Sequence, residues 1–277
     1  MRLNHPLLRS AKFLVGIGIL VFFIVLAIVV SWLRPNPKAM IDVAWLAPSS
    51  QRILGTDLFG RDVFSLFANG VNMSIRIGLL AGIVATLLGV AVGAVAGYKG
   101  GATDELLMSI TNIMLVIPTL ALLIVIAAFL KIRNEMFLAL IIGVTSWPWT
   151  ARSIRSQTLS LKAREFIDLP RISGLSELEI IVQDVLPNML SYVFMCFALQ
   201  MANGILSETG LSMIGLGPTD IVSLGMMLRW ALLWETVRLG KWWLFIPPTI
   251  AITLLTTSLL LVNTAMDEVF NPRMRKT

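Results

Sequence analysis

The stretch that decides the fold is RSIRSQTLSLKAREFIDLPRISGLSELEIIVQDVLP, residues 152–187. It carries basic and acidic residues in nearly equal numbers and lies between long apolar runs. Lipid disfavours so many charges, so we expect a segment outside the membrane that binds another protein. The alternative is a hairpin that lies on lipid headgroups, but anionic lipid favours an excess of basic residues, which this stretch lacks.

The overall composition is that of an integral membrane protein. Of the 277 residues, 57% are hydrophobic and 14% are charged, and the mean hydropathy is +0.84. Soluble domains are less apolar and carry more charge. The basic residues behind the net charge of +6 flank apolar runs and form no stripe interleaved with aromatics, so we expect no nucleic-acid partner.

The cysteine and histidine counts exclude two kinds of site. The chain has one cysteine, Cys196, inside an apolar run, and one histidine, His5. A disulfide framework or a Cys/His metal site needs more of these residues, so we expect neither. The sequence also lacks the G-x-x-x-x-G-K-[ST], H-E-x-x-H and G-x-S-x-G motifs. We therefore expect no catalytic residue, no enzyme activity and no cofactor bound by this chain itself.

The apolar runs predict an all-α integral membrane fold with six transmembrane helices. About 20 apolar residues cross the hydrocarbon layer as a helix. The six runs are 13–33, 77–97, 106–130, 136–151, 185–207 and 242–266. Pro118 predicts a kink in the third run. Glycines spaced by four on one face of the second run predict close approach of a neighbouring helix.

The Lys and Arg residues outside these runs predict the orientation. Their bias places both tails, 1–12 and 267–277, in the cytosol together with the loop 152–184. The segment 34–76 is then extracytoplasmic. Arg76 is expected to begin the second span, and Glu208 to lie at the outer boundary after the fifth.

The charged loop itself predicts two short helices separated by a break. Its first helix is expected to end near Asp168, because Pro170 disfavours helix at the residue before it. Gly174 then allows a turn, and Ser176 with Glu179 forms an S-x-x-E capping box that begins the second helix. The apolar stripe of the first helix consists of Leu159, Ala163, Phe166, Ile167 and Pro170.

Five motifs carry a family resemblance. EFIDLP (165–170), Gly174 and LPN (186–188) are similar to the "EAA" loop of permease subunits in binding-protein-dependent ABC importers. GTDLFGRD (55–62) resembles the GTDxxGRD signature of the dipeptide/oligopeptide/nickel permeases. GYKGGATDE (97–105), ETGLSMIGLG (208–217) and NPR (271–273) also match, and the chain resembles the second permease type of such systems.

The resemblance implies a type I ABC importer permease with a cytosolic coupling helix. The loop departs from the family pattern, because Asp168-Leu169-Pro170 stands where Glu-Ala-Ala is usual and Asp184 replaces an isoleucine. The residues that the resemblance assigns to ATPase coupling are Arg164, Glu165, Asp168, Pro170, Gly174, Leu186 and Pro187.

The resemblance also implies the partners and the setting. These are a second homologous permease subunit, two cytosolic ABC ATPase subunits that use ATP and Mg, an extracytoplasmic solute-binding protein, and the lipid of a prokaryotic cytoplasmic (inner) membrane. Short peptides are the expected substrate, with nickel complexes or oligosaccharides as alternatives within the family. An ion-coupled secondary transporter is disfavoured, because the middles of the six predicted spans lack Asp, Glu, Lys and Arg.

Two further sets of residues are candidates for the site. The outer-face signature consists of Gly55, Thr56, Asp57, Gly60, Arg61 and Asp62, where Asp57, Arg61 and Asp62 are expected to form a local salt-bridged turn. Tyr192, Gln200 and Asn203 share one side of the fifth run. They are expected either to line a translocation path or to hydrogen-bond between helices, and the sequence leaves both open.

Overall fold

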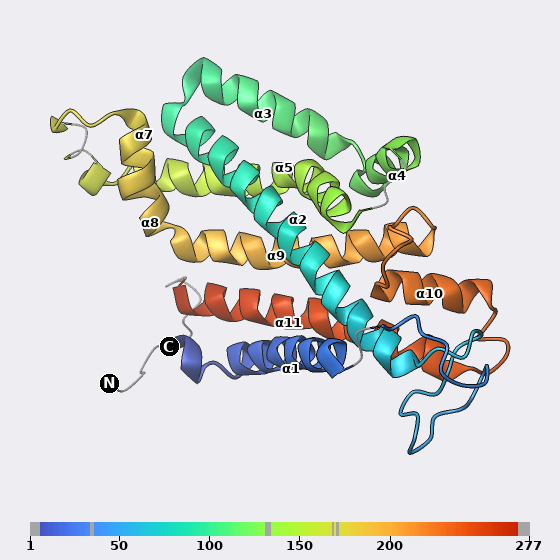
Figure 1. The fold of residues 1–277 in the computed structure, drawn as a ribbon. Coiled ribbons are helices and arrows are strands. Elements are labelled where there is room, and N and C mark those ends of the chain that lie inside the picture. Colours follow the sequence, from blue (N-terminus) through green and yellow to red (C-terminus); the bar gives the residue numbers. More distant parts are fainter. Residues whose placement is uncertain (1–5, 34–35, 131–133, 168, 170–171, 271–277) are drawn as a thin grey trace.

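The structure is a computed structural model that describes residues 6–33, 36–130, 134–167, 169 and 172–270. These residues form helices and connecting turns, and the only β-structure among them is two isolated bridges. The long helices form one bundle, and different short helices lie at its two ends (Figure 1). We name the ends by the short helices that lie there, α7 (Glu177–Ile180) and α10 (Leu224–Leu233).

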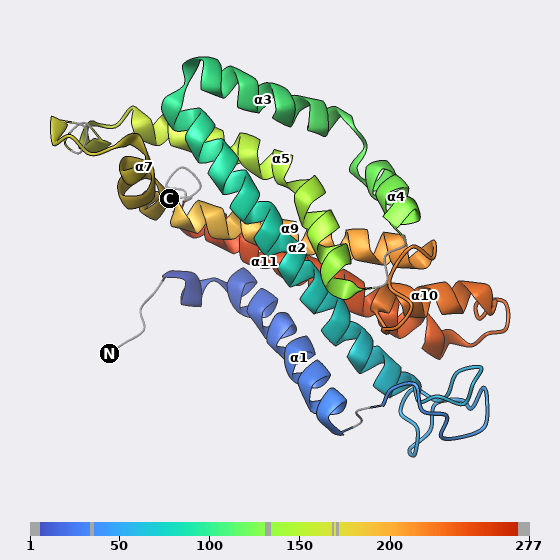
Figure 2. The ribbon, with the colours of Figure 1, turned by 45° about the horizontal axis from the view of Figure 1, so that its top comes forward.

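Helices α1 (Ala11–Leu33) and α11 (Ile246–Phe270) lie side by side and run in opposite directions (Figures 1 and 2). Gly16 permits this approach, since a Cβ there would lie 2.8 Å from the carbonyl oxygen of Ser258. The 3₁₀ turn η1 (Pro6–Arg9) and the last residues of α11 both lie at the α7 end.

Helix α2 (Val63–Lys99) is the longest and crosses the bundle obliquely (Figure 2). It begins well before the predicted span 77–97, because the Asp62 side chain caps it by accepting a hydrogen bond from the Ser65 N–H at 3.0 Å. Arg76 therefore lies inside the helix rather than at its start, where it pairs with Glu135 at 2.6 Å. Polar residues in the first turns had suggested a segment outside the membrane.

The glycines of α2 face two different helices. A Cβ at Gly78 or Gly82 would meet α9 (Leu190–Met213) within 2.5–3.0 Å. A Cβ at Gly89 or Gly93 would meet α5 (Glu135–Lys162) within 2.4–2.5 Å. The predicted close approach is thus confirmed, with two partners in succession.

The third predicted span is two helices, α3 (Gly101–Val116) and α4 (Thr119–Leu130), with an angle of 83° between them. The break falls at Ile117 and Pro118, so the kink predicted at Pro118 is confirmed and is sharp. Helix α5 continues past the predicted end at residue 151, with Pro148 inside it. The fifth predicted span, 185–207, starts and ends earlier than α9.

By length and hydropathy, four described helices could cross a membrane, or five if the bent pair α3–α4 counts as one span. The candidates are α1, α2, α9 and Trp242–Val269, which joins the 3₁₀ turn η4 (Trp242–Leu244) to α11. Helix α5, which contains the fourth predicted span, is not among them. The count of six spans therefore stays a prediction.

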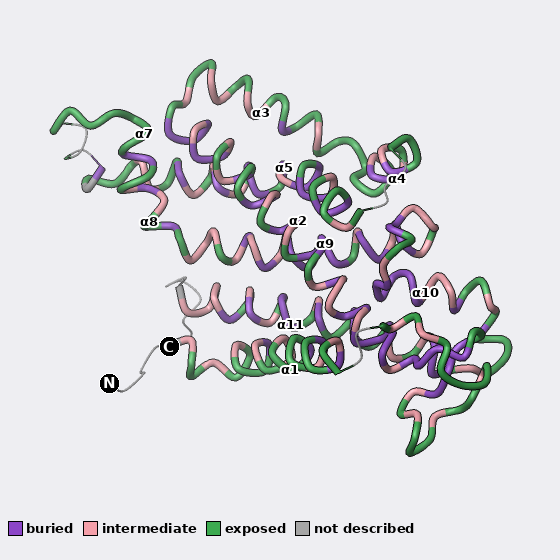
Figure 3. The backbone as a smooth tube through the Cα atoms, in the orientation of Figure 1, coloured by how far each residue is buried: buried purple, intermediate pink, exposed green. Residues whose placement is uncertain are grey.

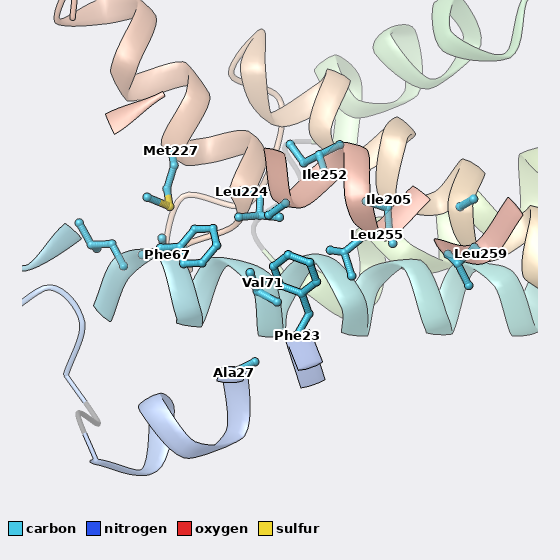
Figure 4. Packing of buried hydrophobic residues seen from close by; sticks show 14 of the residues in the cluster. Phe23, Ala27, Phe67, Val71, Ile205, Leu224, Met227, Ile252, Leu255 and Leu259 are labelled. Atoms are coloured by element: carbon cyan, nitrogen blue, oxygen red, sulfur yellow. The ribbon is translucent and has the colours of Figure 1, made fainter. Parts of the chain in front are cut away.

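The largest buried cluster joins α1, α2, α9, α10 and α11 (Figure 4). Phe23 of α1, Phe67 of α2 and Leu255 of α11 belong to it. The outer surfaces of the bundle remain apolar: α1 and α3 are exposed over most of their length (Figure 3), and Phe22, Ile28 and Ile113 are at least 60% exposed. Such surfaces are suited to lipid or to another membrane subunit.

Candidate functional site

The segment between α5 and α9, residues 163–189, projects from the bundle at the α7 end (Figure 1). We call it the connector. Its named elements are a 3₁₀ turn η2 (Glu165–Ile167), α7, a π-helical turn η3 (Ile181–Val185) and α8 (Leu186–Asn188), and Leu169 and Ile172 are helical as well.

The first half of the connector differs from the predicted helix. Helix α5 runs without interruption to Lys162, whose ammonium group donates to the carbonyl oxygen of Tyr98, and Leu159 therefore belongs to α5. The 3₁₀ turn η2 follows, and Leu169 and Ile172 are also helical. The stripe predicted on one short helix is thus divided between the end of α5 and η2, and its last residue, Pro170, lies outside the described residues.

The capping box that begins the second connector helix is confirmed. The Glu179 carboxylate accepts from the Ser176 N–H at 2.7 Å, and the Ser176 hydroxyl accepts in turn from the Glu179 N–H at 3.4 Å. Hydrogen bonds from the hydroxyl and N–H of Ser176 hold the pKa of Glu179 below its ordinary value.

The predicted coupling residues lie mostly on the surface. Arg164, Glu165, Gly174 and Pro187 are exposed, and Leu186 is half-buried. Gly174 has a φ of +81°, a backbone conformation that glycine adopts readily. Asp168 and Pro170 lie outside the described residues.

The connector is fixed to the bundle by a buried cluster. Ile167, Ile180 and Val185 are at most 1% exposed and pack in one cluster with Tyr98 of α2 and Cys196 of α9. Ile154 of α5 belongs to the same cluster, so three long helices meet the connector there. On its other side the connector exposes apolar side chains to the surroundings: Leu169, Ile172, Leu175, Leu178 and Val182 are 36–82% exposed.

The signature GTDLFGRD forms a tight loop before α2, at the α10 end. Asp57 is fully buried, and its carboxylate accepts from the N–H groups of Phe59 and Arg61 at 2.9 Å each and from the Arg61 Nε at 2.6 Å. The salt bridge predicted between Asp57 and Arg61 is confirmed. The side chain of Asp62 also caps α2.

The same loop ties distant elements together. The Arg61 guanidinium lies 4.4 Å from the ring centre of Trp230 in α10, in cation–π geometry. The carbonyl oxygen of Thr56 accepts from the Trp243 indole N–H at 3.1 Å. Gly55 and Gly60 have positive φ angles, and a Cβ at Gly60 would lie 2.0 Å from the carbonyl oxygen of Asp42. The signature is thus a structural brace between the start of α2, α10 and η4.

A cavity of about 370 Å³ lies between the α3–α4 break, the middle of α5 and α9. Its lining includes Pro148 and several polar side chains, but no charged one. Its lining is Met114, Leu115, Thr119, Thr145, Ser146, Pro148, Trp149, Leu199, Gln200 and Asn203.

The three predicted path residues have separate roles. Gln200 is buried and its amide donates to the Ser146 carbonyl at 2.9 Å and to the Thr150 hydroxyl at 2.7 Å, which bridges α9 to α5. Asn203 donates to the Ser146 hydroxyl at 3.2 Å but remains exposed to the cavity. Tyr192 is not among the lining residues; it hydrogen-bonds Ser153 and Gln157 of α5.

Sequence reasoning missed a buried carboxyl group. Glu208 was expected at the boundary after the fifth span, but it lies inside α9 and is 0% exposed. Its oxygens accept from the hydroxyls of Ser74 in α2 at 3.0 Å and of Ser212 in α9 at 2.7 Å. The ETGLS motif gave a signal in hindsight, since serine follows glutamate by one helical turn.

The described residues contain no group of three or more His, Cys, Asp or Glu that could hold a metal ion. The charged pairs of the bundle are structural links between its elements, such as Arg155 of α5 with Asp104 of α3.

Comparison with known proteins identifies the family of this chain. Residues 89–276 match the family described as "binding-protein-dependent transport system inner membrane component". The oligopeptide transport system permease protein OppC of Mycobacterium tuberculosis is 38% identical over 65% of this chain, and the alignment covers 63% of that protein, less than two thirds of its length. The dipeptide transport system permease protein DppC of Bacillus subtilis is 30% identical over 94% of this chain and 82% of its own length.

A putative peptide transport system permease protein of Brucella suis is 29% identical over 97% of this chain and 90% of its own length. The family match begins at Gly89 in α2 and includes the connector, the cavity-lining part of α9 and all of α10. By this match the chain belongs to the family of inner membrane components of binding-protein-dependent transport systems.

Proposed function

We propose that this chain is a transmembrane permease subunit of an ATP-driven ABC importer of short peptides. The observation that carries the proposal is the connector, which exposes apolar side chains on one side and is anchored on the other in a cluster shared by α2, α5 and α9. The connector then lies in the cytosol, and the α10 end faces outward.

The exposed apolar face of the connector is suited to a protein groove rather than to water. Ile172 is 82% exposed and Leu178 is 61% exposed, on either side of the Gly174 turn. A short helix with such residues binds by its apolar face in a groove of its partner. A cytosolic ATPase subunit is the proposed occupant, and a second ATPase subunit would serve the sister permease.

The cavity is proposed to be this subunit's part of the translocation path. Polar side chains in the membrane face protein or water rather than lipid, so the exposed Asn203 requires a neighbour across the open side of the cavity. A second, homologous permease would supply that neighbour. The cavity lining carries no charge, which suits the neutral amide backbone of a peptide better than a metal cation.

The peptide substrate rests on the relatives, which are named as oligopeptide and dipeptide permease proteins. The family description supports delivery by an extracytoplasmic solute-binding protein. ATP and Mg would be used by the partner ATPases, with no cofactor on this chain.

The test is purification of the tagged chain from its native membrane, followed by reconstitution of what accompanies it. We expect a sister permease, ATPase subunits and uptake of labelled peptide that depends on ATP. Uptake should persist when an ionophore removes the proton gradient. Recovery of the chain alone, with uptake that follows the proton gradient, would contradict the proposal in favour of an ion-coupled transporter.

A pair of variants tests the coupling surface. Ile172→Asp places a charge on the exposed apolar face, and we expect the ATPase subunits to be lost during purification while the chain stays inserted. Ile172→Val keeps an apolar side chain at the same place and should retain them. Equal retention in both variants would rule out this face as the docking site.

A further inference from the structure

The buried carboxyl group of Glu208 connects three helices. Ser74 belongs to α2, Ser212 to α9, and Ser223, whose hydroxyl also hydrogen-bonds the carboxyl, is the N-cap of α10. All four residues are at most 2% exposed. The acid has no part in the cavity lining, and the transport scheme above gives it no role.

The directions of the hydrogen bonds form two relays from α10 to the acid. The Leu224 N–H donates to the Ser74 hydroxyl at 3.2 Å, and this hydroxyl donates to Glu208 Oε2 at 3.0 Å. The Met226 N–H donates to the Ser223 hydroxyl at 3.1 Å, which passes on to the same carboxyl. Free N–H groups at a helix start carry partial positive charge, so both relays direct it toward the carboxyl oxygens.

The neighbouring glycines allow this junction to close. Gly217 and Gly225 lie against Ser212, where a Cβ on either would come within 2.1 Å and 2.8 Å of its side chain. Gly215 turns the chain with a φ of +89° beneath the guanidinium of Arg229 in α10. The motif ETGLSMIGLG therefore builds one compact joint between the end of α9 and the start of α10.

We propose that Glu208 is a positioning residue whose carboxyl group holds the start of α10 against α2 and α9, so that α10 and the cavity-lining helix α9 move as one unit during transport. The movement rests on the proposed function, whereas the anchoring of α10 does not. Glu208 lies on the same helix as Gln200 and Asn203, and a displacement of α10 at the outward end is transmitted to the cavity through it.

The anchoring is tested by a distance measurement. Spin labels at Leu87→Cys in α2 and Leu232→Cys in α10 occupy exposed positions, and Cys196 is buried and poorly reactive. The complex in nanodiscs should give one narrow distance distribution. Glu208→Gln keeps the shape but replaces one acceptor oxygen by an N–H₂ donor, so we expect a distribution that is clearly broader or shifted.

Thr209→Val is the matched control. Thr209 is the next residue of α9, and its buried hydroxyl has no hydrogen-bond partner in the described part of the chain. Valine has the same shape, so the narrow distribution should remain. An unchanged distribution in Glu208→Gln would overturn the anchoring. If that variant does not accumulate, Ser74→Ala, which removes one relay, is measured instead with the same two outcomes.

The joint movement of α9 and α10 is tested by a second measurement, the rate of ATP hydrolysis. Glu208→Gln should keep basal hydrolysis but require about tenfold more loaded binding protein for half-maximal stimulation, as expected for loss of one buried hydrogen bond. Unchanged stimulation together with a broadened distance would overturn the joint movement of α9 and α10. A wild-type complex that does not transport peptide would refute the proposed function and leave the distance result standing.

Discussion

Arg155 of α5 and Asp104 of α3 form a two-point ion pair, in which Nε–Oδ1 and Nη2–Oδ2 are each 2.5 Å apart. The pair is partly buried and lies near the end of the bundle that carries the connector. It joins the start of the bent α3–α4 unit to the helix that leads into the connector. The two elements that border the cavity are thereby held together at one end.

Asp104→Asn should loosen this joint. The variant loses the charge of a two-point pair, and we expect it to lower stability by about 1–3 kcal/mol. Thermal unfolding in detergent measures this loss. Glu105→Gln, at the exposed neighbouring position, is the control and should unfold at the wild-type temperature. Equal melting of both variants would show that the pair contributes nothing.

Gly60→Ala should destabilise the signature loop. The added methyl group meets the Asp42 carbonyl oxygen, and a φ of +69° costs an alanine about 1–2 kcal/mol. We expect faster proteolysis within residues 36–62 and a lower melting temperature. Gly18→Ala in α1, where a Cβ would meet nothing within 4 Å, should be neutral or slightly stabilising. The same cleavage rate in both would contradict the tight loop.

Substitutions at Gln200 and Asn203 should have different effects, the first mainly on stability and the second mainly on peptide transport. Gln200→Leu removes the two hydrogen bonds of Gln200 to α5, and we expect a loss of about 1–2 kcal/mol in stability. Asn203→Leu keeps the two Gln200 bonds and loses only the bond of Asn203 to the Ser146 hydroxyl, so its melting should fall less than that of Gln200→Leu while the changed lining alters peptide uptake. Melting curves and uptake rates of the reconstituted complex show whether each residue contributes to stability or to transport. If Asn203→Leu alters melting alone, the residue bridges helices and does not line the path.

The α7 capping box should weaken in acid. The pKa of Glu179 is lowered in the folded chain from an ordinary value of 4.5. Its contribution is therefore complete above that ordinary value and is lost as the pH falls through the folded pKa. Hydrogen exchange of α7, corrected for the intrinsic rate, should rise below about pH 4.5 relative to neutral pH. Ser176→Ala should exchange fast at both pH values, and a pH-independent wild type would contradict the assignment.

Local features could be predicted from the sequence. The capping box of Ser176 and Glu179 and the ion pair of Asp57 and Arg61 join residues within one turn of each other, so their spacing is sufficient. The break at Pro118 follows from the missing N–H. The all-helical class follows from the long apolar runs, because a backbone in lipid must satisfy its own hydrogen bonds.

Contacts between residues that are far apart in the sequence could not be predicted from it. The start of α2 was missed because its first turns carry polar residues, and only the structure pairs Arg76 with Glu135 of α5. Glu208 depends on Ser74, far away in the sequence, and no spacing rule connects them. Tyr192 and Asn203 both hydrogen-bond to α5, at different places along it, but only Asn203 lines the cavity, which depends on how α5 packs.

The π-helical turn η3 gives the connector a built-in degree of rotation. A π-turn holds one more residue than an α-turn, and one residue corresponds to about 100° around a helix axis. If Ile181–Val185 tightened into α-helical register, the residues that precede it would swing around the axis of α9 by that angle. A small movement of the connector along the helix axis would thus be accompanied by a large rotation of the connector about that axis.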